Sequence, residues 1–481
     1  MPGDAPDRDS SAPATESATD AGDSRRPSVG PPDVLPADDD PVEPRTLSGA
    51  EPSASVPPAE ASGLRHSVRA FRHRDFAVFW CGALVSNTGS WLQNLTVPYV
   101  LYQLTGSAFW VSLATVSQFA PGLLLGPLGG SLADRYARRR ILLLTQSAMA
   151  FVALLLWGAW ATGLRDPVVV LALVGLSGVV AGVNTPSWQS FVNDLVPRQD
   201  LISAVTWNSL QFNAARSLGP GIAGLLLAAF GPAWAFLVNA VSFLFVLAAL
   251  AAVRPGRRPV AAGVRLPVHR QFREAIAYSR RSPGILMALL VTVTVAALGN
   301  SIFQFTVVFA GSELDVGPVG LGLLNAAFGV GAVLAAPITS GSRRLSRART
   351  VRWGLVVYGV GIVGFGLAPW FGLALVSLGL VGGAFLAVIS ASNTALQVIV
   401  ADHIRGRVLA LRIMVFTGTT PIGALLQGWL ADHVGPRPTV VGAGVLLLVV
   451  ATVLGRLRGP VRMSRLDDPP DETPDAPEVA G

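Results

Sequence analysis

One charged residue lies deep inside an apolar stretch of the sequence. Arg216 is about 13 residues into the run 203–230, which corresponds to roughly 20 Å along a helix at ~1.5 Å per residue. If the run crosses a membrane, a cation at that depth is costly and must face water, a ligand or a protein partner. Arg216 is therefore a candidate for direct contact with a polar or charged substrate, and a structural pair inside the protein is the alternative.

Amide and tryptophan side chains recur at helical spacing in four other apolar runs. Spacings of three or four residues place the members of each set on one helix face. Such groups either line a polar cavity or join helices by modest hydrogen bonds, and the four sets together favour a cavity for a bulky amphipathic compound. The sets are Asn87, Trp91 and Asn94; Asn184 and Trp188; Asn300 and Gln304; and Asn393 and Gln397.

Other chemistry is not indicated by the sequence. The five histidines are peripheral and scattered, and Cys81 is the single cysteine, so no metal site is predicted. We find no nucleophile elbow, phosphate loop or ATP-binding motif. We therefore predict that the protein is neither an enzyme nor a primary pump and that it uses no cofactor. The apolar runs contain no Asp or Glu; Asp75 and Asp134 lie at their edges, so a proton-carrying residue is not identified.

The composition predicts a polytopic membrane protein. Of 481 residues, 51% are hydrophobic and 14% charged, and the mean hydropathy is +0.53, whereas soluble domains carry about 25% charged residues. Runs of about 20 apolar residues can cross a bilayer. We predict an all-α fold with twelve transmembrane helices at 76–104, 107–133, 141–163, 167–191, 203–230, 233–253, 284–309, 320–341, 351–369, 371–398, 408–431 and 437–455.

The domain organisation follows from the same runs. We predict a six-helix bundle over 66–253, a cytoplasmic linker over 254–283 and a second six-helix bundle over 284–456. Acidic tails at 1–65 and 457–481 have too little apolar surface to offset the entropy of ordering, which predicts disorder.

The arginines predict the orientation. One set of connections, with the segments that flank the first and last runs, contains 27 arginines, and the opposite set contains only Arg165 and Arg437. The positive-inside rule places the basic face and both termini in the cytoplasm, and we expect the plasma membrane. Because these arginines alternate with apolar runs, nucleic acid is not an expected partner.

Polar landmarks repeat between the two halves. Asn184-Thr185 matches Asn393-Thr394, and Gly231-Pro232 matches Gly435-Pro436. Six-helix repeats of the same orientation predict two pseudo-symmetric bundles with a substrate site near the midplane between them.

The segment 130–140 resembles the signature loop of the major facilitator superfamily, in which a Gly, an Asp-Arg pair and a basic cluster follow the second helix. Its counterparts here are Gly130, Asp134, Arg135, Arg138 and Arg139. The carboxylate of Asp134 could bind at a helix N-terminus and also to nearby guanidinium groups. These interactions would form a latch that favours one packing of the two halves. A basic loop that only sets topology is the alternative.

Further segments resemble the enterobactin-exporter and macrolide-efflux branch of this superfamily. They are 213–224, which contains the helix-bending pair Gly219-Pro220, 239–243 and 405–408. The resemblance implies that the first, fourth, seventh and tenth spans line the cavity. It also implies secondary export of an antibiotic-, macrolide- or siderophore-like small molecule by rocker-switch alternating access, driven by a proton gradient as an antiporter. A lipid or lysophospholipid flippase and a non-transporting membrane sensor or scaffold are the alternatives.

Overall fold

The computed structural model describes residues 68–254, 268–341, 346–457 and 461–469, without the side chains of some helical residues within 127–134, 268–271 and 336–341. The predicted N-terminal tail, 1–65, lies outside the described residues. The described part is helical and contains no strand, which confirms the predicted all-α fold.

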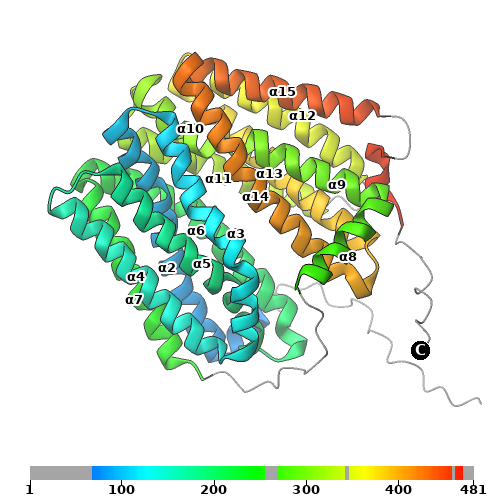
Figure 1. Ribbon diagram of the computed structural model, residues 1–481, viewed down its shortest axis with the longest axis horizontal. Coiled ribbons are helices and arrows are strands. Elements are labelled where there is room, and N and C mark those ends of the chain that lie inside the picture. Colours follow the sequence, from blue (N-terminus) through cyan, green and yellow to red (C-terminus); the bar gives the residue numbers. More distant parts are fainter. Residues whose placement is uncertain (1–67, 255–267, 342–345, 458–460, 470–481) are drawn as a thin grey trace, which may run out of the picture. The chain divides into compact units, whose positions relative to one another are not determined.

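The helices form two groups in chain order (Figure 1). The first group consists of η1 (Arg69–Arg72), α2 (Arg74–Thr105), α3 (Ala108–Arg135), α4 (Arg138–Ala161), α5 (Pro167–Asp194), η2 (Arg198–Asp200), α6 (Leu201–Phe230) and α7 (Pro232–Ala252). The second group consists of α8 (Val268–Arg281), α9 (Pro283–Thr294), the π-helical turn η3 (Val295–Gly299), α10 (Ile302–Ser312), α11 (Gly317–Gly341), α12 (Arg347–Gly366), α13 (Phe371–Ile399), α14 (Asp402–Val434), α15 (Pro436–Arg456) and η4 (Met463–Asp467).

Every predicted span coincides with a helical segment to within a few residues, and the run 284–309 is the one that is interrupted, by η3. Within the described residues, nine segments are long and apolar enough to cross a membrane. The long helices outside this set are α12, α2 and α6, and the last two are the longest of the three. In α2 and α6, polar residues such as Asn87, Asn94 and Arg216 lower the hydropathy.

The two Gly-Pro landmarks have the same structural role. Gly231 and Gly435 have φ of +78° and +103°, a region that favours glycine because a side chain would be strained there. Pro232 and Pro436 begin α7 and α15, where a proline loses no helical hydrogen bond. Each pair therefore ends one helix and begins the next, as the sequence repeat suggested.

Most helix packing occurs within α2–α7 or within α9–α15, and the large contacts between the two groups are α3 with α14 and α6 with α11. Small residues allow the second contact. A Cβ added at Gly224 would lie 2.9 Å from the Cα of Gly322, and one added at Gly322 would lie 3.0 Å from the Cα of Gly224. The backbones of α6 and α11 therefore touch, which is the packing that small residues permit in membranes.

Two segments differ from the sequence predictions. The predicted linker contains the amphipathic helix α8, whose Glu274 accepts a hydrogen bond from Arg407 of α14 at 2.5 Å. The tail predicted to be disordered contains η4, in which Met463 and Leu466 are buried and Asp467 accepts from the backbone N–H of Arg347 at 2.7 Å. Two apolar anchors and a helix cap thus order this part of the tail; residues 470–481 lie outside the described residues.

Candidate substrate cavity

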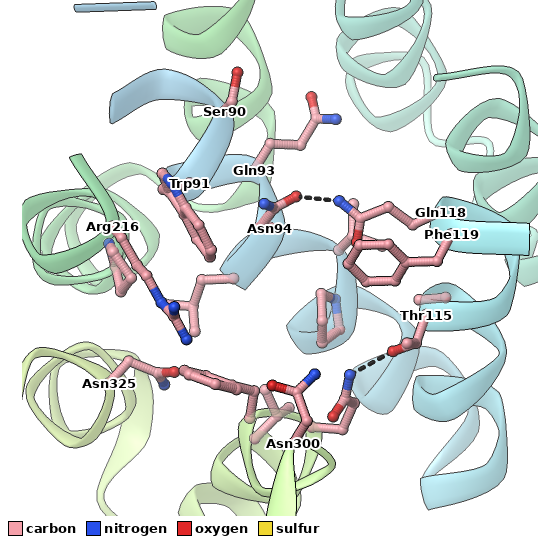
Figure 2. Close-up of a pocket in the computed structure, with 18 of the residues that line it drawn as sticks. Ser90, Trp91, Gln93, Asn94, Thr115, Gln118, Phe119, Arg216, Asn300 and Asn325 are labelled. Carbon is pink, nitrogen blue, oxygen red and sulfur yellow. Dashed lines mark hydrogen bonds between the residues drawn. The ribbon is translucent and has the colours of Figure 1, made fainter. Parts of the chain in front are cut away.

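A cavity of about 430 Å³ lies where α2, α3, α5 and α6 meet α10, α11, α13 and α14 (Figure 2). This volume falls in the range of small-molecule sites, roughly 300–1,000 Å³. Polar side chains in its wall include Asn87, Ser90, Gln93, Asn94, Thr115, Gln118, Ser177, Arg216, Asn300, Gln304 and Asn325, and aromatic ones include Trp91, Phe119, Phe212, Phe303, Phe328, Phe385 and Phe416. The wall is therefore amphipathic.

The π-helical turn η3 presents one side of the wall. Asn300 follows the turn directly, and Gln304 lies in the first part of α10. A π-turn leaves backbone carbonyls unpaired, which is tolerated in a membrane only when other groups satisfy them. Gln427 of α14 donates to the carbonyl of Ala297 at 2.7 Å and to the Oγ of Ser301 at 3.2 Å. The break is thus a stabilised feature, and such turns are frequent at functional sites.

Amides from α2 form the opposite side, and neighbouring helices hold them in place. Asn94 Oδ1 accepts from Gln118 Nε2 of α3 at 2.9 Å (Figure 2). Asn87 Nδ2 donates to Gln211 Oε1 of α6 at 3.2 Å. Each asparagine thus has one polar atom bonded to a neighbouring helix, and its other polar atom makes no hydrogen bond with the described residues.

Arg216 points into the cavity from α6 (Figure 2). Its guanidinium carbon lies 4.9 to 5.3 Å from the centroids of four aromatic rings, which belong to Trp91, Phe303, Phe328 and Phe385. Aromatic faces attract a cation within about 6 Å. Arg216 makes no ion pair or hydrogen bond with the described residues, and its Nε is buried without a partner.

The pair Gly219-Pro220 brings α6 against α2. A Cβ added at Gly219 would lie 2.5 Å from the Cβ of Trp91 and 2.9 Å from the carbonyl oxygen of Thr88, so a larger residue would separate the helices. Pro220 is buried and lines the cavity. This close contact positions Arg216, one turn earlier in α6, beside Trp91.

The residues predicted from the fourth span do not line the cavity. Asn184 Oδ1 accepts from Thr145 Oγ1 at 2.8 Å and from Gln146 Nε2 at 3.1 Å, both in α4, and Trp188 packs against Phe79 at a ring distance of 4.9 Å. They therefore join helices. The cavity residue Ser177 precedes Asn184 by seven positions, about 10 Å along the helix, so a part of α5 nearer its N-terminus lines the cavity.

The tenth-span residues are also absent from the cavity wall. Asn393 Oδ1 accepts from Arg412 Nη1 at 3.1 Å, which links α13 to α14. Gln397, one turn further along α13, is exposed. Spacing alone identified a shared helix face, but that face is turned towards α14 and the outside rather than towards the cavity.

The predicted gating loop is described in part. The surroundings of Gly130 and the side chain of Asp134 are not among the described parts, and Arg135 is exposed at the end of α3. Arg138 forms an ion pair with Asp194 of α5 at 2.7 Å. Arg139 donates to the carbonyl of Ala251 at the end of α7, also at 2.7 Å. These two arginines thus tie α4 to α5 and α7.

Sequence reasoning missed several cavity residues. Gln118 and Thr115 come from α3 and Asn325 from α11, helices to which we had assigned no cavity role. Listing every amide inside an apolar run would have found Gln118 and Asn325. The aromatic rings around Arg216 carried no comparable signal, because phenylalanines occur throughout such runs.

An all-helical membrane protein with an amphipathic cavity between two groups of packed helices belongs to the class of membrane transporters. The model of the transmembrane secretion effector family matches residues 66–480, and the chain belongs to this family of the major facilitator superfamily. The predicted resemblance is thereby confirmed.

Three comparisons illustrate its relationships. The chain is 26% identical over 395 residues to the multidrug efflux pump Tap of Mycolicibacterium fortuitum, which covers 78% of the chain and 94% of that protein. It is 28% identical over 424 residues to the enterobactin exporter EntS of Citrobacter koseri, covering 84% and 96%. The crystal structure of a D-xylose–proton symporter matches with a TM-score of 0.63 at 15% identity, covering 82% of the chain and 99% of the symporter, which shows a shared fold.

Proposed function

We propose that the protein is a secondary active exporter of small amphipathic compounds in the plasma membrane. The observation that carries the proposal is the cavity of about 430 Å³ between the two helix groups, which has both aromatic and amide walls. The names of two relatives, a multidrug efflux pump and an enterobactin exporter, support the direction of transport. Antibiotic-, macrolide- and siderophore-like molecules are the classes we expect.

In this proposal the chain crosses the membrane twelve times as two six-helix bundles, α2–α7 and α9–α15, with both termini in the cytoplasm. The bundles rock about the cavity, which opens alternately to each side. The contacts α3–α14 and α6–α11 would close the outer side. They include Asp432 near the end of α14, which accepts from the N–H of Ala108 at 2.7 Å and from that of Phe109 at 3.2 Å.

The gating loop would act on the cytoplasmic side. We propose that Asp134 and Arg135 form the latch that holds the cytoplasmic side closed, while Arg138 and Arg139 anchor the loop through their contacts with α5 and α7. A proton gradient is the proposed energy source. The described residues that line the cavity include no acid, so the proton carrier would be at the periphery, where Asp134 and Asp432 lie.

The experiment is an accumulation assay in an efflux-deficient host with a panel of macrolides, other antibiotics, dyes and siderophores. The intact chain should lower accumulation of at least one compound, and Asp134→Asn, at equal membrane abundance, should restore it. An uncoupler should also restore it. Deletion of residues 1–60 should leave transport intact, whereas a scaffold that uses this tail would lose its function. No change for any compound would contradict export of this class.

A further inference from the structure

The charge in the cavity wall has a single sign. Arg216 is the only charged residue among the described residues that line the cavity, and the wall contains no carboxylate. The protein also leaves this cation without an ion-pair partner elsewhere among the described residues, and its Nε is buried and unpaired. An unpaired charge inside a membrane protein is costly to keep, so a ligand is the expected partner.

The aromatic rings explain how the protein tolerates this cation before a substrate arrives. Rings of Trp91, Phe303, Phe328 and Phe385 surround the guanidinium at 4.9 to 5.3 Å, and their faces offer partial negative charge. Unlike a carboxylate, an aromatic ring does not neutralise the arginine. The cavity therefore keeps its positive charge, and the rings add an apolar surface beside it.

The amides do not offset this preference. Asn94 has its oxygen engaged by Gln118, which leaves its N–H groups, whereas Asn325 uses its nitrogen on Thr306 and Leu321, which leaves its oxygen. Both donors and acceptors are thus available to neutral polar groups of a ligand. Only Arg216 distinguishes an anion from a cation.

We infer that the transported substrate is an amphipathic organic anion whose acidic group, a carboxylate or a comparable oxyanion, binds Arg216 while its apolar body lies against the aromatic rings. This inference rests on the proposed export function and narrows its substrate class. Guanidinium groups hold oxyanions by paired, charge-assisted hydrogen bonds. An amphipathic amine of the same size would place like charges together, and it is disfavoured.

The test uses three probes with one aromatic body: anthracene-9-carboxylate, its methyl ester, and the (anthracen-9-ylmethyl)trimethylammonium cation. Binding is measured by equilibrium dialysis with the full-length protein in lipid nanodiscs, and empty nanodiscs are subtracted. We expect the carboxylate to bind at least tenfold more tightly than the ester, and the cation to bind weakest. Arg216→Gln should remove the preference for the carboxylate over the ester. Arg216→Lys should retain part of it, because charge remains without the planar fork.

Folding of each variant is checked by its thermal unfolding midpoint. Equal binding of carboxylate and cation, or a carboxylate preference that survives in folded Arg216→Gln, would overturn the inference. A different result would refute the proposed export function, namely that no compound of the accumulation panel is exported. Export of cationic panel members by the wild-type protein, at rates that Arg216→Gln leaves unchanged, would refute the anion inference while leaving the exporter intact.

Discussion

Replacing Gly224 by alanine should impede closure of the contact between α6 and α11. The added Cβ would lie 2.7 Å from the carbonyl oxygen of Pro318 and 2.9 Å from the Cα of Gly322. Both are backbone atoms, which cannot turn away as a flexible side chain would. Ordinary contact begins at 3.4 Å, so the helices would have to separate by about 0.7 Å. Overpacking of this kind costs ~1–3 kcal/mol.

The cost applies only to the conformation in which the two helices touch. In a two-state transporter the equilibrium constant for closing this side should therefore fall about 5- to 150-fold. Gly221→Ala is the matched control, because it lies in the same helix and an added Cβ there meets nothing within 4 Å. Alanine is also the better helix former at both positions, so helix propensity does not explain a difference between them.

The assay is disulfide trapping in membranes. Ser107 Oγ donates to Asp432 Oδ2 at 2.5 Å across the neighbouring α3–α14 contact, so cysteines at these two positions should cross-link when this side is closed. The exposed native Cys81 is first replaced by serine. Gly224→Ala should slow cross-linking relative to Gly221→Ala by the factor given above. Equal cross-linking rates in the two variants would refute the view that α6 and α11 touch at Gly224 in only one of the two conformations.

Three further predictions address other parts of the molecule. Asp432→Asn removes the charge that caps α3, an interaction worth ~0.3–1 kcal/mol. The equilibrium constant for closing this side should therefore fall by up to about fivefold, as measured by spin-label distances across the α3–α14 contact. An unchanged distance distribution would show that Asp432 does not stabilise the closed conformation. Gln427→Leu should lower the free energy of unfolding by ~1–3 kcal/mol, because the buried carbonyl of Ala297 loses its hydrogen-bond donor. The measurement is the thermal unfolding midpoint, which should fall. The control Gln397→Leu, at an exposed position of α13, should leave the midpoint unchanged. If the substrate is a monovalent anion that moves without a counter-ion, a membrane potential of 100 mV contributes ~2.3 kcal/mol, or roughly a 50-fold concentration gradient of the substrate. This gradient is measured in proteoliposomes with a potential imposed by valinomycin. A gradient that does not change with the potential would show that the charge of the substrate is compensated, for example by proton exchange.

Much of the fold could be predicted from the sequence because it depends on local properties. Length and apolar composition of each run decide whether a helix forms and crosses a bilayer, and every predicted span coincides with a helical segment. The Gly-Pro landmarks also depend only on local backbone geometry, and the two pairs that match in sequence have the same role in the structure. Even the interruption at η3 left the span boundaries nearly unchanged.

The ordered part of the C-terminal tail depends on residues far away in the chain. Composition predicted disorder after residue 456, yet Leu466 is fully buried and Asp467 caps α12. No local property of this acidic, proline-rich segment indicates that a helix start over a hundred residues earlier would donate its backbone N–H groups to the carboxylate of Asp467.

The sequence by itself determined which residues are polar within the membrane, and the tertiary structure alone decided which of them share a cavity. Asn94 and Asn184 have the same residue type and comparable helical surroundings, yet one lines the cavity and the other bonds to α4. Spacing defines a face of one helix, whereas the rotation of that helix against its neighbours decides where the face points. Arg216 was conspicuous from its depth alone, but its four aromatic neighbours come from four different helices, α2, α10, α11 and α13. Only packing could bring them together around one unpaired charge.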